Sequence, residues 1–568
     1  MSTKIAGAEA IIKSLLAEGV ETIFGYPGGA IIPVYDALYG YKSELHHILV
    51  RHEQAAIHAA QGFARVSGKV GVAIVTSGPG ATNVITGITD ALMDSTPLVV
   101  ISGQTPSKGL GSDAFQETDV IGITQPVTKW NYQVRNAEEI PWAISRAFYI
   151  AQSGRPGPVV VDITKDAQMG KLEWRYEKCN YIRSYEPYPV PDKRAVLAAA
   201  DLINSAHKPL IIAGHGVMIS GAEEELLTLA EKASIPVVNT LLGLSTVPSE
   251  HPLFKGMVGM HGNIGANVNT NKCDVLVAIG MRFDDRVTGD TETYAKQAKI
   301  IHVDIDPSEF DKNIKSDVSI LGDAKTVLKE LLPMVKQAEH KEWLASFDLP
   351  DKVEFEKVVK EEVYPEGGFL NMGEVARKVS EFSGNKAVLV TDVGQNQMLS
   401  SRYFKFSEPK SIVTSGGLGT MGFGLPASLG AKLGAPNRQV CLFVGDGGLQ
   451  MTIQEFGTIL EYRIPVKIIL LNNNFLGMVR QWQELFFDKH YSETPMVNPD
   501  YVKICQAYGI EAEDVCEREE LDAAIRRMLD SDSAYLLNVR IKPNNMVFPM
   551  VPAGASIDNI LLNSEERY

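Results

Sequence analysis

Short apolar runs alternate with helix-length amphipathic stretches along most of this chain. Three such runs, PLIIAGHG at 209–216, CDVLVAIG at 273–280 and CLFVGDGG at 441–448, end in glycine. Buried strands that alternate with helices are typical of parallel sheets with helices on both faces. The pattern therefore predicts an α/β protein made of three doubly wound units with mostly parallel sheets.

The pattern is interrupted in two places, and these interruptions suggest domain boundaries. The segment RSYEPYPVPDKR at 183–194 is rich in Pro and Tyr and is typical of a linker, and charged, weakly patterned sequence occupies 336–366. We therefore predict an N-terminal domain over 1–182, a middle domain over 190–340 and a third domain over 366–543. The apolar tail, 544–568, is expected to fold over a functional site.

Polar residues follow two apolar strands of the third domain. Asp446 follows CLFVG, Asn473 follows VKIILLN, and a helix-length stretch separates them. The parallel strands of such a βαβ unit present both ends at one sheet edge. A carboxylate and an amide oxygen there suit Mg²⁺ bound through a diphosphate, and Gly447 and Gly448 would let the backbone approach the phosphates. The alternative is an ordinary strand-end turn followed by an Asn cap.

Glu53 stands where a short strand gives way to an Ala-rich helix, in ILVRHEQAAIHAAQGFARVSG. A carboxyl group at this place could be buried at an interface, where desolvation raises its pKa and suits it to general acid–base catalysis. The alternative is a first-turn Glu that only interacts favourably with the helix dipole.

Composition fits a large enzyme and excludes several other classes. The chain has 568 residues, of which 45% are hydrophobic, enough for several buried cores. Its net charge of −15 disfavours nucleic-acid binding. The five cysteines show no CxxC spacing, so we expect a reducing, cytoplasmic location. The N-terminus shows no signal pattern, and no apolar run reaches the roughly 18 residues of a membrane span.

The middle domain carries several weaker signals of nucleotide binding. Gly214 and Gly216 follow one strand, and Gly280 follows another, with the cluster RFDDR just beyond it at 282–286. Ligands of open α/β sheets usually bind at such strand ends. Asp304 and Asp306 follow a third strand, where they could hydrogen-bond a ribose or adenine, or could only cap a loop.

Motifs along nearly the whole chain resemble those of one family of thiamin diphosphate enzymes. In order they are GYPGGAI, SGPGATN, DAFQETD, RPGPVVVDITKD, RFDDRVTG, TSGGLGTMGFGLPA, GDGG, NNNFLGMVRQWQ and MVFPMVPAGA. They are similar to the catalytic large subunits of biosynthetic, FAD-containing acetohydroxyacid synthases, also called acetolactate synthases. The chain departs from the family pattern at Asn396, where the family commonly has His, and an Asn there can still donate to a phosphate.

The resemblance implies three cofactors, namely thiamin diphosphate, Mg²⁺ and FAD. The Mg²⁺ ligands would be Asp446, Asn473 and the backbone oxygen of Phe475. Glu53 would activate the cofactor at its aminopyrimidine ring, and Met421 would bend it, unless Met421 only fills the core. The residues that would contact the diphosphate are Gly394, Gln395, Asn396, Gly419, Gly447 and Gly448. The residues that would contact FAD are Arg155, Gly214, Gly216, His261, Gly280, Arg282, Asp304, Asp306 and Asp323.

The resemblance also implies a reaction and its partners. Pyruvate would be decarboxylated, and the remaining two-carbon unit would be joined to a second pyruvate or to 2-oxobutanoate, in the first common step of branched-chain amino acid biosynthesis. The assembly would be a homodimer or a tetramer built on it, with a small regulatory subunit. Neither nucleic acid nor a membrane is expected as a partner.

The substrate pocket follows from the same resemblance. Gly29, Gln116 and Lys165 would line it. Arg286 would hold the acceptor's carboxylate with its planar fork, or else form a surface ion pair with Asp284 or Asp285.

A helix is expected to begin at LGMVRQWQ. It would place Met478 and Trp482, four residues apart, on one face toward the cofactor. Trp482 would then favour 2-oxobutanoate over pyruvate, or else it only fills the core.

Three other functions would use parts of the same sequence pattern. A simple 2-oxoacid decarboxylase would carry a His-His pair where this chain has Phe115 and Gln116. A pyruvate oxidase would use the flavin for redox chemistry, which the sequence does not exclude. A non-catalytic binding protein is disfavoured because Glu53, Asp446 and Asn473 are all present.

Overall fold

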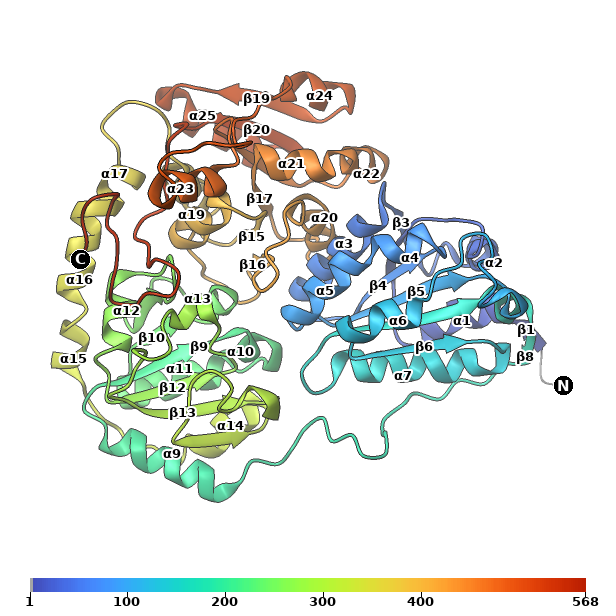
Figure 1. The fold of residues 1–568 in the computed structure, drawn as a ribbon, viewed down its shortest axis with the longest axis horizontal. Coiled ribbons are helices and arrows are strands. Elements are labelled where there is room, and N and C mark those ends of the chain that lie inside the picture. Colours follow the sequence, from blue (N-terminus) through green and yellow to red (C-terminus); the bar gives the residue numbers. More distant parts are fainter. Residues whose placement is uncertain (1–3) are drawn as a thin grey trace.

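The structure is a computed structural model that describes residues 4–568. It contains three six-stranded sheets (Figure 1). The strands of each sheet are all parallel. Figure 1 shows the three units side by side, the N-terminal one in blue and cyan, the middle one in green and the C-terminal one in orange and red. The predicted fold class is confirmed, while the domain boundaries given above stay a prediction.

The N-terminal sheet has the strand order β3-β2-β4-β5-β7-β6. Its strands are β2 (Thr22–Gly25), β3 (His46–Leu49), β4 (Gly71–Val75), β5 (Leu98–Gln104), β6 (Trp130–Val134) and β7 (Pro158–Thr164). Its helices are α1 (Gly7–Ala17), α2 (Ile32–Leu38), α3 (Glu53–Ser67), α4 (Pro79–Asn83), α5 (Ile85–Met93), α6 (Val120–Thr124), α7 (Ile140–Gln152) and α8 (Lys165–Met169). A separate antiparallel pair, β1 (Lys4–Ala6) and β8 (Lys171–Glu173), joins the two ends of this domain.

The C-terminal sheet has the order β16-β15-β17-β18-β20-β19, which is the order of the N-terminal sheet when each is numbered from its own first strand. Its strands are β15 (Val388–Thr391), β16 (Ile412–Val413), β17 (Val440–Gly445), β18 (Lys467–Asn472), β19 (Glu511–Val515) and β20 (Tyr535–Arg540). Its helices are α18 (Met372–Phe382), α19 (Gln395–Tyr403), α20 (Gly424–Gly434), α21 (Asp446–Thr452), α22 (Phe456–Tyr462), α23 (Gly477–Phe486), α24 (Tyr501–Ala507) and α25 (Arg518–Asp530).

The middle sheet has a different order, β11-β10-β9-β12-β13-β14, which is the order of dinucleotide-binding sheets. Its strands are β9 (Pro209–Ala213), β10 (Val237–Asn239), β11 (Phe254–Met257), β12 (Val275–Ile279), β13 (Lys299–Asp304) and β14 (Val318–Leu321). Its helices are α9 (Lys193–Ser205), α10 (His215–Ser220), α11 (Glu223–Ala233), α12 (Ile264–Thr270), α13 (Asp285–Thr288) and α14 (Ala324–Leu331). In such a sheet the strand order reverses between β9 and β12, and ligands bind in the crevice at this point.

Helices cover both faces of each sheet, because alternate strand residues belong to different apolar cores. Val72 and Ile74 of β4 contribute to one core, and Ala73 and Val75 to another. The C-terminal and middle sheets divide in the same way. This two-sided burial explains why the strands are nearly continuous apolar runs in the sequence.

The connecting segments differ in structure. Residues 174–192 contain no helix or strand, as expected of a linker. The charged stretch before the C-terminal domain, for which the sequence pattern gave no element, forms α15 (Lys341–Ala345), α16 (Asp348–Glu354) and α17 (Lys360–Val363). The tail after β20 runs back to the middle domain, where the N–H of Val551 donates to the carbonyl of Met260 at 2.7 Å. No helix within 4–568 is long and apolar enough to cross a membrane.

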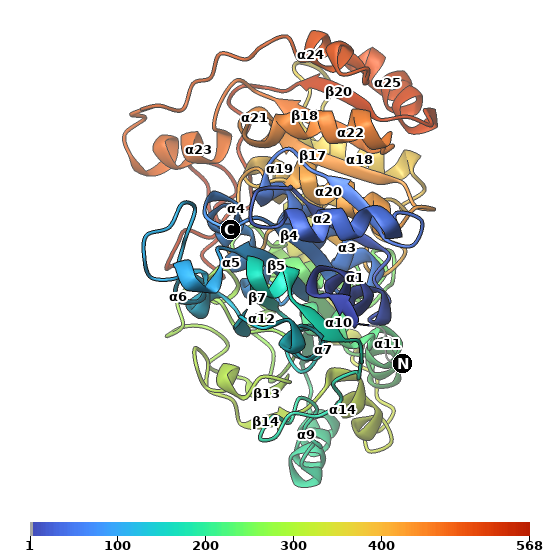
Figure 2. The same cartoon turned by 90° about the vertical axis from the view of Figure 1, so that its right-hand side faces the viewer.

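Helix α3 of the N-terminal domain packs directly against α20 of the C-terminal domain (Figure 2). The two backbones touch at small residues. A Cβ added to Gly430 would overlap the carbonyl oxygen of Ala59, and one added to Gly62 would overlap that of Ala427. The helix that begins with Glu53 is therefore fixed against the C-terminal domain along its length.

Gly430→Ala is expected to destabilise this contact. The added methyl group overlaps backbone, which cannot rotate away, and overpacking of this kind costs about 1–3 kcal/mol. Thermal unfolding of purified variants measures the effect. Gly40→Ala is the matched control, because a Cβ at Gly40 meets no atom within 4 Å. A Gly430→Ala protein as stable as wild type would contradict the described packing.

Candidate active site

The predicted metal and diphosphate residues gather at the carboxyl edge of the C-terminal sheet. Strands β17 and β18 are neighbours in register, with Gly445 opposite Leu471, so Asp446 and Asn473 follow adjacent strand ends. Both side chains are buried, with 1% and 3% of their surface exposed. Gly394, Gln395 and Asn396 follow β15, the other neighbour of β17.

Asp446 is held by the protein but keeps room for a cation. Its Oδ2 accepts hydrogen bonds from the N–H of Asn474 at 2.8 Å and from Nδ2 of Asn498 at 2.6 Å. Its Oδ1 accepts one from the N–H of Gly447 at 3.0 Å. Burial raises the pKa of Asp446, and these donors oppose the rise. One acceptor site remains on Oδ1, and a bound cation would favour the ionised form.

Asn473 offers a second oxygen at the same place. Its Oδ1 accepts the N–H of Phe475 at 3.1 Å and keeps another lone pair. Within residues 4–568 no group of three or more His, Cys, Asp or Glu side chains could hold a metal ion. These residues therefore fit Mg²⁺ only if amide, backbone and diphosphate oxygens supply the remaining ligands, as the sequence predicts.

The glycines that follow Asp446 pack closely against neighbouring residues. A Cβ at Gly448 would overlap Oδ1 of Asp392, and one at Gly447 would lie 2.6 Å from Cδ2 of Leu476. The methyl group of Met421 lies 3.6 Å from that same Gly447 position. Met421 is half-buried and belongs to none of the apolar cores, which disfavours the core-filling alternative. The packing of this turn therefore requires glycine at both positions.

Two further diphosphate candidates lie beside this turn. Gly394 has a φ of 121°, a conformation that favours glycine. Asn396 is buried, and its Oδ1 has no hydrogen-bond partner among the described residues, while its Nδ2 donates to the carbonyl of Val393 at 3.2 Å. An unsatisfied buried amide fits a site that is completed by a ligand.

The N-terminal candidates lie at the carboxyl edge of their own sheet. Glu53 is the first residue of α3, as predicted, and its Oε2 accepts a hydrogen bond from Nδ2 of Asn83 at 2.9 Å. Nζ of Lys165 donates to the carbonyl of Gly29 at 3.1 Å. Gln116 has a φ of 60°, and its backbone lies against Gly78. The structure thus brings Lys165 to Gly29. Glu53 begins the helix after β3, and Gln116 lies in the segment after β5, which two strands separate from β3 in the sheet.

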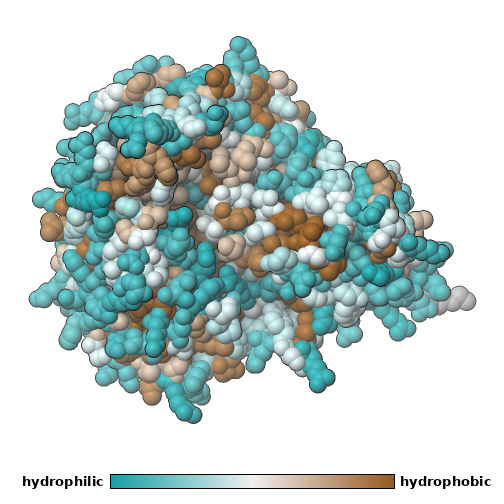
Figure 3. All heavy atoms as spheres, in the orientation of Figure 1, coloured by the Kyte–Doolittle hydropathy of each residue, from teal (hydrophilic) through white to brown (hydrophobic). Residues whose placement is uncertain are grey.

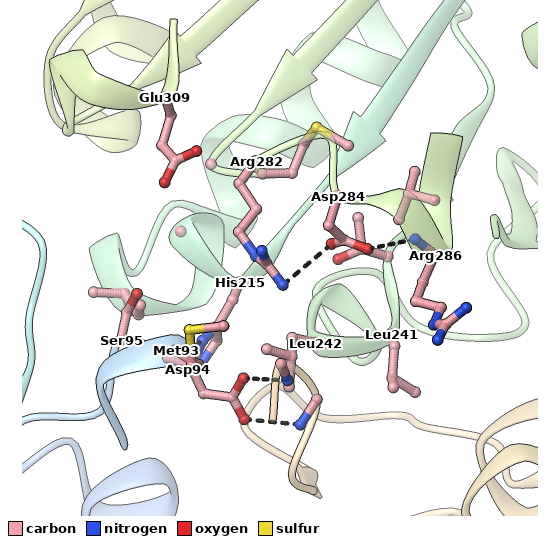
Figure 4. A pocket seen from close by; sticks show the side chains of 18 of the residues that line it. Met93, Asp94, Ser95, His215, Leu241, Leu242, Arg282, Asp284, Arg286 and Glu309 are labelled. Atoms are coloured by element: carbon pink, nitrogen blue, oxygen red, sulfur yellow. Dashed lines mark hydrogen bonds and ion pairs between the residues drawn. The ribbon is translucent and has the colours of Figure 1, made fainter. Parts of the chain in front are cut away.

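A cavity of about 540 Å³ lies at the strand ends of the middle domain and extends to the other two domains (Figure 4). It is bounded by His215 after β9 and Met281 after β12, at the reversal point of the sheet. The predicted residues that line it are Arg155, Gly216, His261, Gly280, Arg282, Asp304, Asp323, Gly419, Arg286, Met478 and Trp482. Gly214 and Asp306 lie outside its wall, so the cavity does not support direct ligand contacts for these two.

The charges in the cavity are paired and partly desolvated. Arg155 donates from Nη1 to Glu309 at 2.6 Å and to Asp306 at 3.1 Å. Asp306 is therefore the partner of Arg155 in an ion pair. Burial raises the pKa of Asp304 to about 6 and lowers that of His261 to about 4. The wall also contains apolar residues such as Leu241 and Met260. This mixture, in a volume usual for cofactor sites, fits a ligand with flat rings, hydroxyl groups and phosphates.

Arg286 forms the surface ion pair of one predicted alternative, while its role toward an acceptor stays a prediction. Its side chain is 60% exposed and lies 3.7 Å from Asp285, a loose ion pair. It also lines the cavity, at the end that Figure 4 shows beside Asp284 and Leu241. An exposed pair of this kind contributes little to stability, so the guanidinium is free to bind an anion.

Met478 and Trp482 lie on α23, the helix expected at LGMVRQWQ. Both line the cavity, as residues four apart on one face of a helix can. Trp482 is half-buried and packs against the ring of Phe486, with 5.0 Å between ring centroids. It belongs to none of the apolar cores, so the core-filling alternative is disfavoured.

Three residues at the site were not identified from the sequence. Asn498 binds Asp446 but stands in VNPD, which is a helix-start pattern. Gln481 accepts the N–H of Val547 at 2.8 Å and donates to its carbonyl at 3.1 Å, which holds the tail beside α23. Asp94 binds a loop of the C-terminal domain. Each acts through tertiary contacts, and no local pattern indicates them.

Comparison with known proteins agrees with this geometry. Residues 5–123, 196–331 and 392–539 match the family profiles for the N-terminal TPP binding domain, the central domain and the C-terminal TPP binding domain of thiamine pyrophosphate enzymes. Thiamine pyrophosphate is another name for thiamin diphosphate.

Full-length relatives share the same architecture. The chain is 47% identical to the probable acetolactate synthase large subunit of Methanocaldococcus jannaschii, over 98% of this chain and 95% of the relative. It is 42% identical to the acetolactate synthase large subunit of Lactococcus lactis, over 98% and 96%. It is 41% identical to that of Haemophilus influenzae, over 99% of both chains. The chain therefore belongs to the acetolactate synthase large-subunit family of thiamine pyrophosphate enzymes.

Proposed function

We propose that this protein is an acetolactate synthase. It decarboxylates pyruvate and joins the remaining two-carbon unit to a second 2-oxoacid, either pyruvate or 2-oxobutanoate, in the first common step of branched-chain amino acid biosynthesis. One observation carries the proposal. A single cavity joins the strand ends of a dinucleotide-type sheet to Met478 and Trp482 on the helix that follows the metal-binding strand.

The proposed cofactor set is thiamin diphosphate, Mg²⁺ and FAD. Asp446, Asn473 and the carbonyl of Phe475 hold Mg²⁺, and the glycine turns at 394 and 447–448 hold the diphosphate. The 540 Å³ cavity takes the flavin nucleotide, with Arg155, Arg282, Asp304 and Asp323 on its polar wall. The flavin has a structural role, because the cavity is lined by residues of all three domains, and it performs no redox step in the proposed reaction.

Each catalytic side chain has a defined task. Bound thiamin diphosphate supplies a carbon acid that accepts the two-carbon unit and stabilises the negative charge formed on decarboxylation. Glu53 would exchange a proton with the aminopyrimidine of bound thiamin diphosphate, and Met421, whose methyl group lies beside Gly447, would support the cofactor. Arg286 orients the acceptor through its carboxylate. The apolar surfaces of Met478 and Trp482 keep water from the reacting atoms.

The proposed assembly is a homodimer, or a tetramer built from it, in which Glu53 of one copy serves the diphosphate site of the other. In one chain Glu53 is bonded to Asn83 of its own domain, whereas Met421 lies against Gly447 in another domain. Phe115 is 87% exposed and Val497 is 99% exposed. Figure 3 shows apolar surface gathered near the centre of one face, beside the junction of the domains. Exposed apolar surface of this kind marks association sites.

Two further assignments complete the proposal. A small regulatory subunit is the expected partner, since relatives of this chain are named large subunits. The cytoplasm is the expected compartment, because all five cysteines are free thiols.

Acetolactate formation from pyruvate tests the proposal. Purified protein with thiamin diphosphate and Mg²⁺, assayed colorimetrically with and without FAD, is expected to form acetolactate without an added electron acceptor. Release of acetaldehyde in place of acetolactate would indicate a decarboxylase. Turnover that depends on an electron acceptor, with bleaching of the flavin by pyruvate, would indicate an oxidase.

Trp482→Leu is expected to lower the preference for 2-oxobutanoate over pyruvate by about 10-fold. The indole lies on the cavity wall, where it can contact the extra methyl group of 2-oxobutanoate, and one methylene in an apolar pocket is worth roughly 10–200-fold. Competition between the two acceptors, with both products quantified, measures the ratio. Phe486→Leu is the control, because Phe486 packs against Trp482 and is 42% exposed. An unchanged ratio in an active Trp482→Leu enzyme would remove this role from Trp482.

A further inference from the structure

The loop that connects β16 to α20 in the C-terminal domain is held by the N-terminal domain. Asp94, at the end of α5, accepts hydrogen bonds from the N–H of Gly416 at 2.8 Å and of Gly417 at 2.7 Å. Arg65 of α3 pairs with Asp94 at 2.7 Å and donates to the carbonyl of Thr414. The side chains of Asp94 and Arg65 are 0% and 4% exposed. The bonds are therefore shielded from water. Charged hydrogen bonds are stronger in such a buried environment than in water.

Asp90, one helical turn before Asp94, binds the same loop. Its Oδ1 accepts hydrogen bonds from the hydroxyl of Ser415 and, at 3.0 Å, from that of Thr420. The hydroxyl of Ser415 in turn accepts the N–H of Thr420 at 2.8 Å. We name residues 414–420 the junction loop. Asp90, Asp94 and Arg65 together hold it from one end to the other.

The junction loop separates the two proposed cofactor sites. On one side, Ser415, Gly416, Gly417, Leu418 and Gly419 line the 540 Å³ cavity, together with Met93, Asp94 and Ser95. Figure 4 shows Asp94 below His215 at this wall, with its two bonds to the loop drawn as dashed lines. On the other side, the loop continues directly into Met421, which lies against Gly447 of the diphosphate turn.

Asp94 also touches the middle domain, because its carbonyl faces Nδ1 of His215 at 3.1 Å. His215 follows β9 and lines the cavity. All three domains therefore meet at this one residue. The junction loop and His215 both line the cavity, so a ligand that fills it would contact both, and Asp94 is bonded to both.

We propose that Asp94 is a positioning residue that couples flavin binding in the cavity to thiamin diphosphate binding at the Met421–Gly447 turn. The inference rests on the proposed cofactor set. An occupied cavity fixes the junction loop against Asp94, and the fixed loop holds Met421 where the diphosphate site needs it. Thermodynamic linkage requires the effect to be reciprocal, so each cofactor must tighten the other by the same factor.

Binding measurements test this coupling without any turnover. The dissociation constant of FAD is measured by the quenching of flavin fluorescence, with and without saturating thiamin diphosphate and Mg²⁺. That of thiamin diphosphate is measured by calorimetry, with and without FAD. For each cofactor, the coupling ratio is its dissociation constant without the other cofactor divided by that with it. In wild type the two coupling ratios are expected to agree and to exceed about 5, the lower end of usual coupling.

Asp94→Asn is expected to bring both ratios close to one. The amide keeps the shape of the carboxylate, but it can accept only through its oxygen, so it loses the bond to Gly416 or Gly417 and the charge that holds Arg65. Affinity for FAD alone should change less than the ratio does. A residue that only stabilises the fold would weaken both affinities and leave the ratio unchanged.

Two further variants make the outcome decisive. Glu21→Gln removes one carboxylate charge from the same domain, where Glu21 pairs with exposed Lys69 at 3.0 Å, and it should keep the wild-type ratio. Thr420→Val removes the bond to Asp90 without changing side-chain shape, and a partial loss of coupling is expected. If Asp94→Asn fails to fold, this variant tests whether the junction loop carries the coupling.

Three results would overturn the inference. Wild-type ratios of one, with both cofactors bound, would do so and leave the proposed function intact. Full coupling in Asp94→Asn, or in Thr420→Val when the first variant is unfolded, would do the same. A wild-type protein that binds no FAD would overturn the proposed cofactor set and the inference with it.

Discussion

Replacing Glu53 with glutamine is expected to abolish most activity and to leave the fold intact. The amide is nearly isosteric and can still accept the hydrogen bond from Asn83, so α3 should begin at the same residue. It does not ionise near neutral pH, however, so it cannot exchange a proton with the aminopyrimidine nitrogen. General acid–base catalysis typically contributes about 10²–10⁴-fold, and we expect a loss in that range.

Two measurements separate this effect from a structural defect. Acetolactate formation gives the loss of kcat, and NMR of the bound cofactor gives the exchange rate of its C2 proton, which should fall in parallel. Glu461→Gln is the control, because Glu461 pairs at 2.7 Å with Arg51, two residues before Glu53, and is solvent-exposed. Wild-type exchange in Glu53→Gln would remove Glu53 from its assigned task, while a matching loss in Glu461→Gln would point to the helix start instead.

Asp446→Asn is expected to lower activity at limiting Mg²⁺ by about 100-fold or more, since even residues that only orient metal ligands cost about 10–100-fold. The asparagine has a single oxygen, so it can keep the bond from Asn474 or the one from Gly447 but not both. It lacks the charge that attracts the cation, and its amide nitrogen would face Nδ2 of Asn498 or the metal.

Thermal unfolding gives a second measure that does not depend on turnover. Ligand at 100 times its dissociation constant stabilises the folded state by about 2.7 kcal/mol. Thiamin diphosphate with Mg²⁺ should therefore raise the melting temperature of wild type clearly and that of Asp446→Asn hardly at all. Asp522→Asn, which alters an exposed partner of Lys378 in the same domain, should respond as wild type. An Asp446→Asn protein that responds equally would place the metal elsewhere.

The sequence predicted those parts of the fold and site that depend on neighbouring residues. The strand ends at Asp446 and Asn473 were predictable, because an apolar run followed by a polar or glycine turn is a local signal and parallel strands share an edge. The helix start at Glu53 and the shared face of Met478 and Trp482 are local in the same sense.

What the sequence did not predict depends on contacts between distant segments. Asn498 reaches Asp446 across the sheet edge, and Asp94 reaches Gly416 across a domain junction. Asp306 followed a strand like a ligand-binding residue, yet it pairs with Arg155 from another domain. The helices within 341–363 were also missed, because their charged faces carry only a short apolar stripe.

The pairing of β1 with β8 bears on how the protein is made. It ties Lys4–Ala6 to Lys171–Glu173, so the N-terminal domain is complete once residue 173 has left the ribosome. The junction loop is synthesised about 250 residues later, roughly 12–50 s at about 5–20 residues per second. Throughout that interval the Gly62 face of α3 and the carboxylates of Asp90 and Asp94 stand open to water. During synthesis the chain therefore exists for tens of seconds as a partly folded species. In it, Asp90 and Asp94 stay hydrated until the C-terminal domain has been made.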